Sequence, residues 1–371
     1  MRRISPGGIT NSQPMADSAP NVLQIVPKIP GDHDGVGDYA LRLASILLAD
    51  FGITTSFAVT SELESSKKNH EHVIVHYVNY GYQKRGVPFG LLSSLRNLRR
   101  NSRGRFVTVL HELYASGPVW RSAFWLQPFQ RHIARSVAQI SDVCLVSSET
   151  MLNQLRALLP NVCAEVHPVF SNFGEPSLSS DQFSNRDPHR WVICGGTALI
   201  ERSLRSFRAI LNRISEFFSP RELFVLGGSD NPATRSLLVD LANVRVDYRP
   251  QIDAGEASQV LSTCSFGWLD YFRRSDVPSD VILKSSAFGA MCAHGVITVF
   301  PYRGSPIAIV GDVLPGPYFI NARFIELPPV SDREKVASQI YHWYQRHTSS
   351  KNRARTIARA LGIAAAEDRM P

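Results

Sequence analysis

Phosphate-binding residue types open a helical pattern in the second half of this sequence. In residues 278–299, Lys284, Ser285 and Ser286 follow a polar loop and precede an apolar segment whose residues recur at helical spacing. The free amide groups and the dipole at the start of a helix attract anions, and a lysine in the first turn adds a full positive charge. We therefore expect these three residues to bind a phosphate group.

Glycine-rich turns follow three further apolar runs. Gly35 and Gly37 lie in the loop after the first run, whereas Gly196 and Gly228 follow two runs in the second half of the chain. Glycine lets the backbone approach a ligand closely, and α/β proteins bind ligands at the carboxyl ends of their strands. Together with Lys284, these turns predict a site for a nucleotide diphosphate. The loop around Gly35 lacks the third glycine of the dinucleotide fingerprint G-x-G-x-x-G, which disfavours an oxidoreductase.

Arg202 and His111 are the remaining candidates for catalysis. The Arg202 guanidinium, shortly after one glycine turn, can hold a phosphate through two hydrogen bonds. His111 ends an apolar run, and a histidine at the end of a parallel strand can donate a hydrogen bond or move a proton in the ligand cleft. Burial in the core is the alternative for His111, but the neighbouring Glu112 favours a polar rim. For His76 and His167, in two other apolar runs, we expect structural roles.

Asp32, His33 and Asp34 precede Gly35 and have side chains of types that bind metal ions. Three adjacent loop residues rarely converge on one ion, so a solvated loop is the favoured interpretation. We expect the protein to use neither a metal ion nor a cofactor.

The overall composition describes a globular chain of two domains. Hydrophobic residues make up 44% and charged residues 19% of the 371 positions, and this length suits two domains of ~150 residues each. The sequence contains no run of ~18 uncharged apolar residues, the length that a membrane-spanning helix requires. Five cysteines without a C-x-x-C pair favour a reducing compartment, so a cytoplasmic location is expected.

Short apolar runs alternate with helical stretches through nearly the whole chain, which is typical of α/β proteins with parallel sheets. Strands are expected at 22–26, 54–59, 72–78, 106–110, 143–146, 164–169, 191–194, 223–226, 244–248, 265–271 and 296–300. Helices are expected at 36–50, 89–100, 120–139, 149–159, 203–218, 232–241, 254–263 and 332–366, the last with a break near Thr348.

A polar stretch rich in Ser, Asp, Asn and Pro divides this alternation into two halves. We expect a disordered tail at 1–20, a first Rossmann-like domain at 21–175, a linker at 176–190, a second Rossmann-like domain at 191–345, and a helical segment at 346–371. The predicted fold class is therefore α/β, with two doubly wound domains that face a central cleft.

The net charge of +8 is unevenly distributed. Seven Lys and Arg residues, and no acidic residue, lie between Glu71 and Glu112. Within this stretch, residues 89–100 have the pattern of a basic amphipathic helix that Pro88 opens. Such a helix can rest on an anionic membrane surface, or it can be an ordinary domain helix with a solvated basic face. Nucleic acid is disfavoured as a partner, because no aromatic-basic platform or known motif accompanies the charge.

Taken together, the motifs resemble GT-B glycosyltransferases of the large retaining glycosyltransferase family 4, over residues 21–365. The resemblance rests on GDHDGVGDYALRLASILLADFGI, VTVLHE, LVSSETMLNQL, GGTALIERSLRSF, LFVLGGS and LKSSAFGAMCAHGVITV. It implies a nucleotide-diphosphate sugar bound by the second domain, an acceptor on the first domain, and a final helical segment that packs back on the first domain.

The resemblance also implies roles for individual residues. Gly35 and Gly37 would approach the phosphates of the donor, and His111 would lie beside the transferred sugar. Arg202, in the place of the family's lysine, would neutralise the leaving diphosphate together with Lys284, which would be the main catalytic effect in the absence of a metal.

The chain departs from the commonest family pattern in one respect that bears on chemistry. Most members have two glutamates eight positions apart around the donor-binding helix, whereas residues 281–299 contain no acidic residue. The basic, serine-rich start of this helix and its Ala-His-Gly ending resemble a subgroup that lacks the pair. Asp270, Asp276 and Asp280 are candidates to replace it.

The resulting hypothesis is a retaining, metal-independent glycosyltransferase in polysaccharide, exopolysaccharide or glycolipid biosynthesis. Its acceptor would be a glycan or a lipid-linked glycan, and its location cytoplasmic or peripheral on the inner face of a membrane. Two alternatives remain at this point: a nucleotide-sugar epimerase on the same fold, and a non-catalytic partner of another glycosyltransferase.

Overall fold

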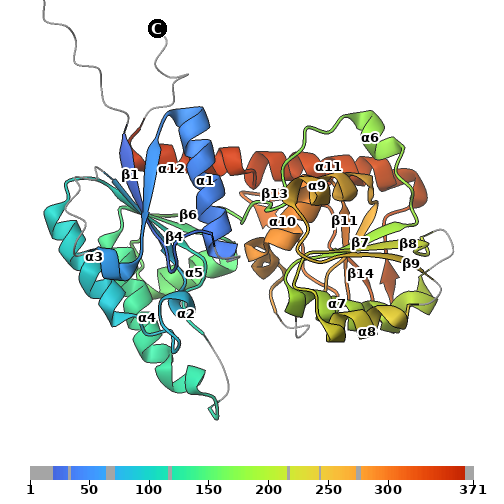
Figure 1. The fold of residues 1–371 in the computed structure, drawn as a ribbon, viewed down its shortest axis with the longest axis horizontal. Coiled ribbons are helices and arrows are strands. Elements are labelled where there is room, and N and C mark those ends of the chain that lie inside the picture. Colours follow the sequence, from blue (N-terminus) through green and yellow to red (C-terminus); the bar gives the residue numbers. More distant parts are fainter. Residues whose placement is uncertain are drawn as a thin grey trace, which may run out of the picture.

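The computed structural model describes residues 20–31, 35–63, 72–115, 119–214, 218–241, 244–272 and 277–363. Within these residues the chain forms two sheet-containing domains, which lie side by side in Figure 1. The expected disordered tail up to residue 19, the loop residues Asp32, His33 and Asp34, and the candidate Asp276 lie outside the described residues.

The first domain contains a six-stranded sheet in which all strands are parallel, in the order β2-β1-β3-β4-β5-β6. Its strands are β1 (Asn21–Ile25), β2 (Thr54–Ala58), β3 (His72–Tyr77), β4 (Phe106–Leu110), β5 (Val143–Val146) and β6 (Ala164–Val166). Its helices are α1 (Gly35–Phe51), α2 (Asn79–Tyr82), α3 (Phe89–Asn101), α4 (Ser122–Ile140) and α5 (Glu149–Leu158), with the 3₁₀ turn η1 (Thr60–Glu62). The strand order reverses between β1 and β3, where such sheets bind ligands.

The second domain contains a seven-stranded sheet in the order β15-β14-β11-β10-β7-β8-β9, in which only β15 is antiparallel. Its strands are β7 (Arg190–Cys194), β8 (Glu222–Leu226), β9 (Arg245–Arg249), β10 (Phe266–Trp268), β11 (Ile297–Phe300), β14 (Tyr318–Ile320) and β15 (Ile325–Glu326). A short hairpin joins β12 (Ala308–Ile309) to β13 (Asp312–Val313). Here the order reverses between β7 and β10, which is the Rossmann arrangement.

Helices of the second domain surround this sheet. They are α6 (Ser180–Ser184), α7 (Thr197–Ile210), α8 (Pro232–Val239), α9 (Ala254–Thr263), α10 (Ser286–Ala293) and α11 (Arg333–His347), with the 3₁₀ turns η2 (Leu211–Arg213), η3 (Ser279–Lys284) and η4 (Val330–Asp332). The short helix α6 lies within the expected linker.

The last helix, α12 (Ser350–Leu361), returns to the first domain. The chain breaks between α11 and α12, where the Ser349 hydroxyl caps the new helix by accepting the Asn352 amide. Helix α12 then packs against α1 and β4, and the two terminal helices run along both domains in Figure 1. Arg353 of α12 is almost fully buried there, with its guanidinium 5.8 Å from the centre of the Tyr39 ring.

The predicted fold class is confirmed, and most expected elements agree with the structure within one or two residues. Helix α7 is an exception, because it begins at Thr197 rather than at residue 203. Gly196 is the N-cap of α7 in an extended conformation, and only Gly195 separates it from β7, so a turn of two glycines connects the strand to the helix. Strand β10 ends at Trp268 rather than at residue 271, because the amide of Asp270 is bound by the Ser203 hydroxyl of α7.

Residues 89–100 were considered as a membrane-surface helix or as an ordinary domain helix, and helix α3 is a domain helix. Its residues Leu91, Leu92 and Leu95 are buried in the core of the first domain, so the leucine face of this helix is not free for a membrane. Arg99 binds the carboxylate of Asp142 through two hydrogen bonds of 2.9 and 3.1 Å. The basic face therefore serves in part to hold the helix on the sheet.

Candidate active site

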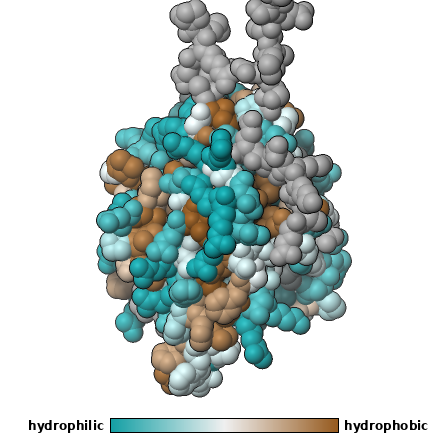
Figure 2. Space-filling model, turned by 90° about the vertical axis from the view of Figure 1, so that its left-hand side faces the viewer, coloured by the Kyte–Doolittle hydropathy of each residue, from teal (hydrophilic) through white to brown (hydrophobic). Residues whose placement is uncertain are grey.

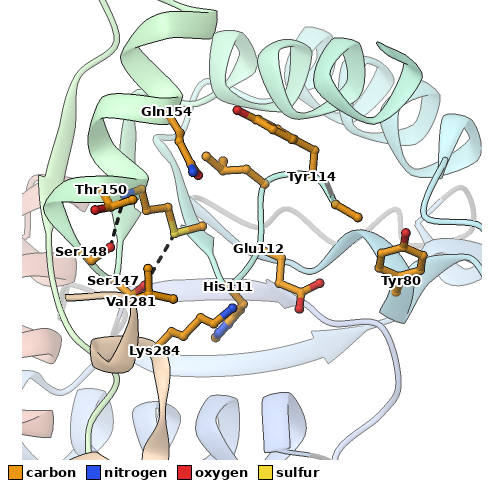
Figure 3. Close-up of a pocket in the computed structure, with 13 residues that line it drawn as sticks. Tyr80, His111, Glu112, Tyr114, Ser147, Ser148, Thr150, Gln154, Val281 and Lys284 are labelled. Atoms are coloured by element: carbon orange, nitrogen blue, oxygen red, sulfur yellow. Dashed lines mark hydrogen bonds between the residues drawn. The ribbon is translucent and has the colours of Figure 1, made fainter. Parts of the chain in front are cut away.

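A cavity of ≈ 360 Å³ lies at the carboxyl edge of the first sheet and is bordered by the second domain. Its wall consists of residues that follow β3, β4 and β5, joined by two residues of η3 (Figure 3). The lining residues are Tyr80, His111, Glu112, Leu113, Tyr114, Ala115, Ser147, Ser148, Thr150, Met151, Gln154, Val281 and Lys284. The cavity therefore combines residues from both domains at the edge where α/β sheets bind ligands.

His111 lies in this wall, and a chain of buried polar side chains stands behind it. The His111 Nε2 atom is 3.5 Å from Nδ1 of His76, and the His76 Nε2 atom is 2.7 Å from the amide oxygen of Gln24. Gln24 and His76 are fully buried. The ring of Tyr39 meets the His111 ring edge-on at 5.1 Å. These contacts fix the orientation of His111 from below the cavity.

The same surroundings keep His111 uncharged. Burial, reinforced by the positive charge of Arg353, lowers the pKa of His111 to about 3. Burial also lowers the pKa of His76, and His111 and Arg353 add to the effect. Both rings are therefore neutral near pH 7, and His111 can donate or accept a hydrogen bond but does not hold a charge. His76, expected to be structural, is the support of His111.

Glu112 and Lys284 bring the two opposite charges of the cavity wall. Glu112 follows His111 at the end of β4, and its carboxylate extends into the cavity in Figure 3. Lys284 enters from the second domain and is exposed to solvent. Glu112 is the only carboxylate among the residues that line this cavity. Glu112 was not among the residues predicted for the site, although its place shortly after the end of β4 was a signal for it.

Lys284 does not lie in the first turn of α10, contrary to the expectation from the sequence. It ends the 3₁₀ turn η3, and Ser285 is the N-cap of α10. The Ser285 hydroxyl accepts the amide of Phe288 at 3.3 Å, and Ser285 is nearly buried. Residues 279–284 form the 3₁₀ turn η3 before the helix starts. Lys284, at the end of this turn, faces the cavity, and Ser285 caps the helix. Ser286, the first residue of α10, is half-buried.

Asp280 connects the second domain to the first. Its two carboxylate oxygens accept hydrogen bonds from the amide and the hydroxyl of Thr150, each at 2.7 Å. Thr150 lies in the first turn of α5, where the helix dipole also favours a negative charge. The amide of Val169 donates to the carbonyl of Leu283 at 2.8 Å, so η3 is held against the first domain at both ends.

Two glycine turns pack directly against each other at the reversal point of the second sheet. A Cβ atom on Gly227 would lie 2.8 Å from the carbonyl oxygen of Gly195, and one on Gly228 would lie 3.1 Å from the backbone of Thr197. The Thr197 hydroxyl accepts the amide of Ser229 at 2.7 Å. Close packing of the two turns therefore accounts for the glycine at position 228.

Gly196 is different, because open space surrounds it. A Cβ atom there would meet nothing within 4 Å, and its φ angle of −75° is available to any residue. No side chain caps the 14-residue helix α7 that begins beside it. The exposed amide groups at this helix start are therefore available to an anion.

Arg202 lies on α7 beside the same reversal point and is already bound to the end of β10. Its Nε donates to the carbonyl of Asp270 at 2.5 Å and its Nη2 to the carbonyl of Tyr271 at 3.0 Å. Its Nε also lies 3.6 Å from the Asp270 carboxylate. Burial raises the pKa of Asp270, whereas Arg202 and a serine hydroxyl oppose the shift. The structure thus places Arg202 outside the 360 Å³ cavity wall, in the neighbouring part of the second domain.

Gly35 and Gly37 lie at the beginning of α1, after the carboxyl end of β1. Gly35 is exposed, and a Cβ atom on it would meet nothing within 4 Å. Gly37 is buried within the first turn of the 17-residue helix. Neither residue lines the cavity. Among the described residues, no group of three His, Cys, Asp or Glu side chains is arranged to hold a metal ion.

No protein-family model and no curated protein matches the sequence. Among solved structures, the N-terminal domain of Candida albicans trehalose-6-phosphate phosphatase is similar with a TM-score of 0.59 and 9% sequence identity, over 95% of this chain and 98% of that chain. An alpha-glucosyltransferase in complex with UDP-glucose and DNA containing an abasic site is similar with a TM-score of 0.55 and 10% identity, over 92% and 99% of the two chains.

A third similar structure is that of WaaG, a glycosyltransferase involved in lipopolysaccharide biosynthesis. Its TM-score is 0.51 and its identity 10%, over 92% of this chain and 99% of that chain. At such low identity these likenesses concern the fold, which extends over nearly the full length of each protein. The chain has the GT-B fold, with two Rossmann-like domains.

Proposed function

We propose that this protein is a glycosyltransferase that moves a sugar from a nucleotide-diphosphate sugar to a glycan or lipid-linked acceptor. The cavity between the domains is the observation that supports this proposal most directly. It lies at strand ends of the first sheet, it is bordered by Lys284 of the second domain, and its wall carries the polar side chains of His111 and Glu112. Two of the similar structures are those of glycosyltransferases, which favours transfer chemistry but does not assign the substrates.

In this proposal the donor lies mainly against the second domain. The open helix start at Gly196 and the guanidinium of Arg202 face the diphosphate, and Lys284 adds a positive charge from the cavity wall. Stabilising the charge that develops on a departing diphosphate is worth several powers of ten in rate. Gly35, Gly37, Gly228, Ser285 and Ser286 remain proposed donor contacts through backbone or hydroxyl groups.

The acceptor lies in the cavity against the first domain. Neutral His111 donates or accepts a hydrogen bond at the transferred sugar, and Glu112 accepts a hydrogen bond from the acceptor hydroxyl. We assign a retaining course, in which the acceptor oxygen bonds to the anomeric carbon on the face that the diphosphate leaves. The bond from the anomeric carbon to the phosphate oxygen breaks, and the acceptor proton passes to that oxygen. No metal ion is required.

A titration with nucleotides tests the donor half of the proposal. Thermal stability of the full chain is followed with UDP, GDP and their common sugar forms, because a ligand that binds only the folded state raises the midpoint. One nucleotide should raise it, and less so in Lys284→Ala. Lys335→Ala, an exposed lysine on α11 far along the sequence, is the matched control and should respond like the wild type.

Transfer itself is tested with the nucleotide sugar that gives the shift. Release of nucleotide diphosphate that depends on an added acceptor supports a transferase, whereas conversion of the donor to its epimer without acceptor supports the epimerase alternative. The absence of acidic residues between 281 and 299 favours the second alternative, a non-catalytic partner. Absence of any nucleotide-dependent shift would assign that role and overturn the proposal.

A further inference from the structure

Exposed aromatic side chains cluster where α4 begins, at the end of the first domain. Figure 1 shows this end of α4 extending beyond the rest of the domain, and Figure 2 shows hydrophobic surface at the same lower end of the molecule. The side chains of Trp120 and Trp125 are 80% and 67% exposed. We call the following set the aromatic tip: Val119, Trp120, Phe124, Trp125, Phe129 and the adjacent Phe89 of α3.

The members of the aromatic tip contact one another and still face solvent. The rings of Phe124 and Trp125 lie 5.4 Å apart, and those of Phe89 and Phe129 lie 6.5 Å apart. The indole nitrogen of Trp125 donates inward to the carbonyl of Val119 at 2.8 Å, which satisfies its one polar group. Soluble proteins rarely leave such a patch uncovered, so it marks a surface that meets another apolar phase.

The aromatic tip belongs to a basic stretch of the sequence. Between Glu71 and Glu149 there are ten Lys and Arg residues, seven before Glu112 and three after it, but only two acidic residues. The two acids are used elsewhere, because Glu112 lines the cavity and Asp142 binds Arg99. On α4 itself, Arg121, Arg131 and Arg135 are exposed, and no ion pair joins them within the described residues.

We infer that the aromatic tip of α4 inserts into the interface of an anionic lipid bilayer. Aromatic and aliphatic side chains favour the boundary between headgroups and acyl chains, and flanking arginines attract anionic headgroups. This surface differs from the one that the sequence suggested, since α3 buries its leucines in the domain core. No described helix is both long and apolar enough to span a membrane, so the contact is peripheral.

Two other partners fit this surface less well. A second copy of the chain would place the same basic surface against itself in a two-fold interface, where like charges repel. Single-stranded nucleic acid binds in a groove that tracks its backbone, where bases stack on open ring faces. The neighbouring rings of the aromatic tip instead meet at 85° and 78°, and they occupy a protruding helix end.

The aromatic tip is connected to the cavity by direct contacts. Gln130, the next residue after Phe129, accepts the amide of Ala115 at 2.8 Å and donates to the hydroxyl of Tyr80 at 3.2 Å. The guanidinium of Arg131 lies 5.4 Å from the centre of the Tyr114 ring. Because Tyr80, Tyr114 and Ala115 line the cavity, a bilayer at the tip brings lipid-linked acceptors to its entrance. This last step rests on the proposed function, whereas membrane binding does not.

Sedimentation with lipid vesicles tests the inference on the full chain. The vesicles are phosphatidylcholine alone or phosphatidylcholine with roughly one-third phosphatidylglycerol, at low and at physiological salt. The wild type should sediment with the anionic vesicles, and its tryptophan emission should shift to shorter wavelength. The Trp120→Ser/Trp125→Ser double variant should bind at least about tenfold more weakly, and Arg121→Gln/Arg135→Gln should lose the preference for anionic lipid.

Phe324→Ser is the matched control, because Phe324 is an aromatic residue of the second domain with 63% exposure, and it should bind vesicles like the wild type. All variants should keep the wild-type thermal midpoint and its shift with nucleotide, which separates this test from that of the proposed function. Equal vesicle binding by the double variant and the wild type would overturn the inference. The inference would also be overturned if the wild type formed a dimer that only the double variant loses. The same holds if the wild type bound a single-stranded oligonucleotide more tightly than anionic vesicles.

Discussion

The two walls of the cleft handle charge in opposite ways. Behind the first-domain wall, Gln24, His76 and His111 form a buried polar chain in which burial holds the imidazole groups neutral. In the second domain, Arg202 stands within ion-pair distance of Asp270, and Lys284 is free in solvent. The difference agrees with the proposed function, in which the first domain takes an acceptor hydroxyl and the second domain takes the phosphates of the donor.

Removal of Arg202 tests the charged wall and should have the largest effect. Under the proposed function, Arg202→Ala should lose the nucleotide-dependent stabilisation and lower kcat/KM on the order of 10²- to 10³-fold, because a charge proposed to bind the diphosphate is removed. Arg202→Lys should recover little, since one ammonium cannot replace the guanidinium that contacts two carbonyls. Initial rates and thermal midpoints measure both effects.

Arg205→Ala provides the control for this experiment. Arg205 lies on the same helix, where it forms an exposed ion pair with Glu201, and its loss should change neither quantity. If Arg202→Ala and Arg205→Ala behave alike, the charged wall is not the donor site.

Glu112 is the one acidic group among the described residues that line the cavity, and its replacement sharpens the comparison. Glu112→Gln keeps the shape but cannot accept a proton or a charged hydrogen bond, so kcat should fall about 10²-fold. The nucleotide-dependent shift in the thermal midpoint should be unchanged, because the proposed function places the donor on the other wall. A loss of nucleotide binding in this variant would show that the two walls are not separate in function.

Acid titration tests whether the His111 ring of the first wall is neutral. The pKa of His111 is about 3 in the folded protein and ~6.5 in the unfolded chain, so the unfolded state takes up a proton first as the pH falls. The contribution of neutral His111 to the free energy of unfolding is fully present above pH ~6.5. It is lost between pH ~6.5 and ~3, at about 1.4 kcal/mol per pH unit. Between pH 6.5 and 5, His111→Gln should therefore lose about 2 kcal/mol less stability than the wild type.

Urea unfolding at the two pH values measures this difference. The pH profile of activity should have the same shape near pH 6.5 in the wild type and in His111→Gln, because the ring of His111 is neutral on both sides of that value. A removable inflection would mean that His111 carries a proton in the reaction.

The bridge between the walls should give the smallest effect. Asp280→Asn loses the charge that accepts two hydrogen bonds from Thr150, and a cap of this kind is worth about 1 kcal/mol. The thermal midpoint should fall by roughly 1–2 °C for a chain of 371 residues, and KM should change more than kcat because the cavity is less firmly closed. Asp253→Asn, which caps α9 within the second domain, should lower the midpoint and leave KM unchanged.

The sequence predicted the fold because each level of its pattern agrees with the next. The apolar runs became β3, β4 and β8 almost residue for residue, and the break near Thr348 separates α11 from α12. The onset of α7 was missed because a glycine N-cap shortly after a strand leaves no polar capping residue to recognise. The position of Lys284 was missed because a 3₁₀ turn and an α-helix share their apolar spacing over one turn.

The candidate site was predicted only where its residues follow strand ends. His111, which follows β4, lines the cavity as expected, and Lys284 reaches the same cavity from the end of η3, whereas Arg202 and the glycines do not line it. The Gln24–His76 contact and the Asp280–Thr150 contact join residues 52 and 130 positions apart. Such contacts depend on how the sheets and domains pack, which no local pattern in the sequence records.

The return of α12 to the first domain has a consequence for how each molecule is made. About 200 residues separate the end of β6 from the end of α12, and at about 5 to 20 residues per second they take roughly 10 to 40 s to synthesise. For that time the ribosome holds a first domain whose α1 surface lacks its covering helix and whose Tyr39 ring lacks Arg353. A nascent chain therefore completes its N-terminal domain last, when the C-terminal helix α12 is made.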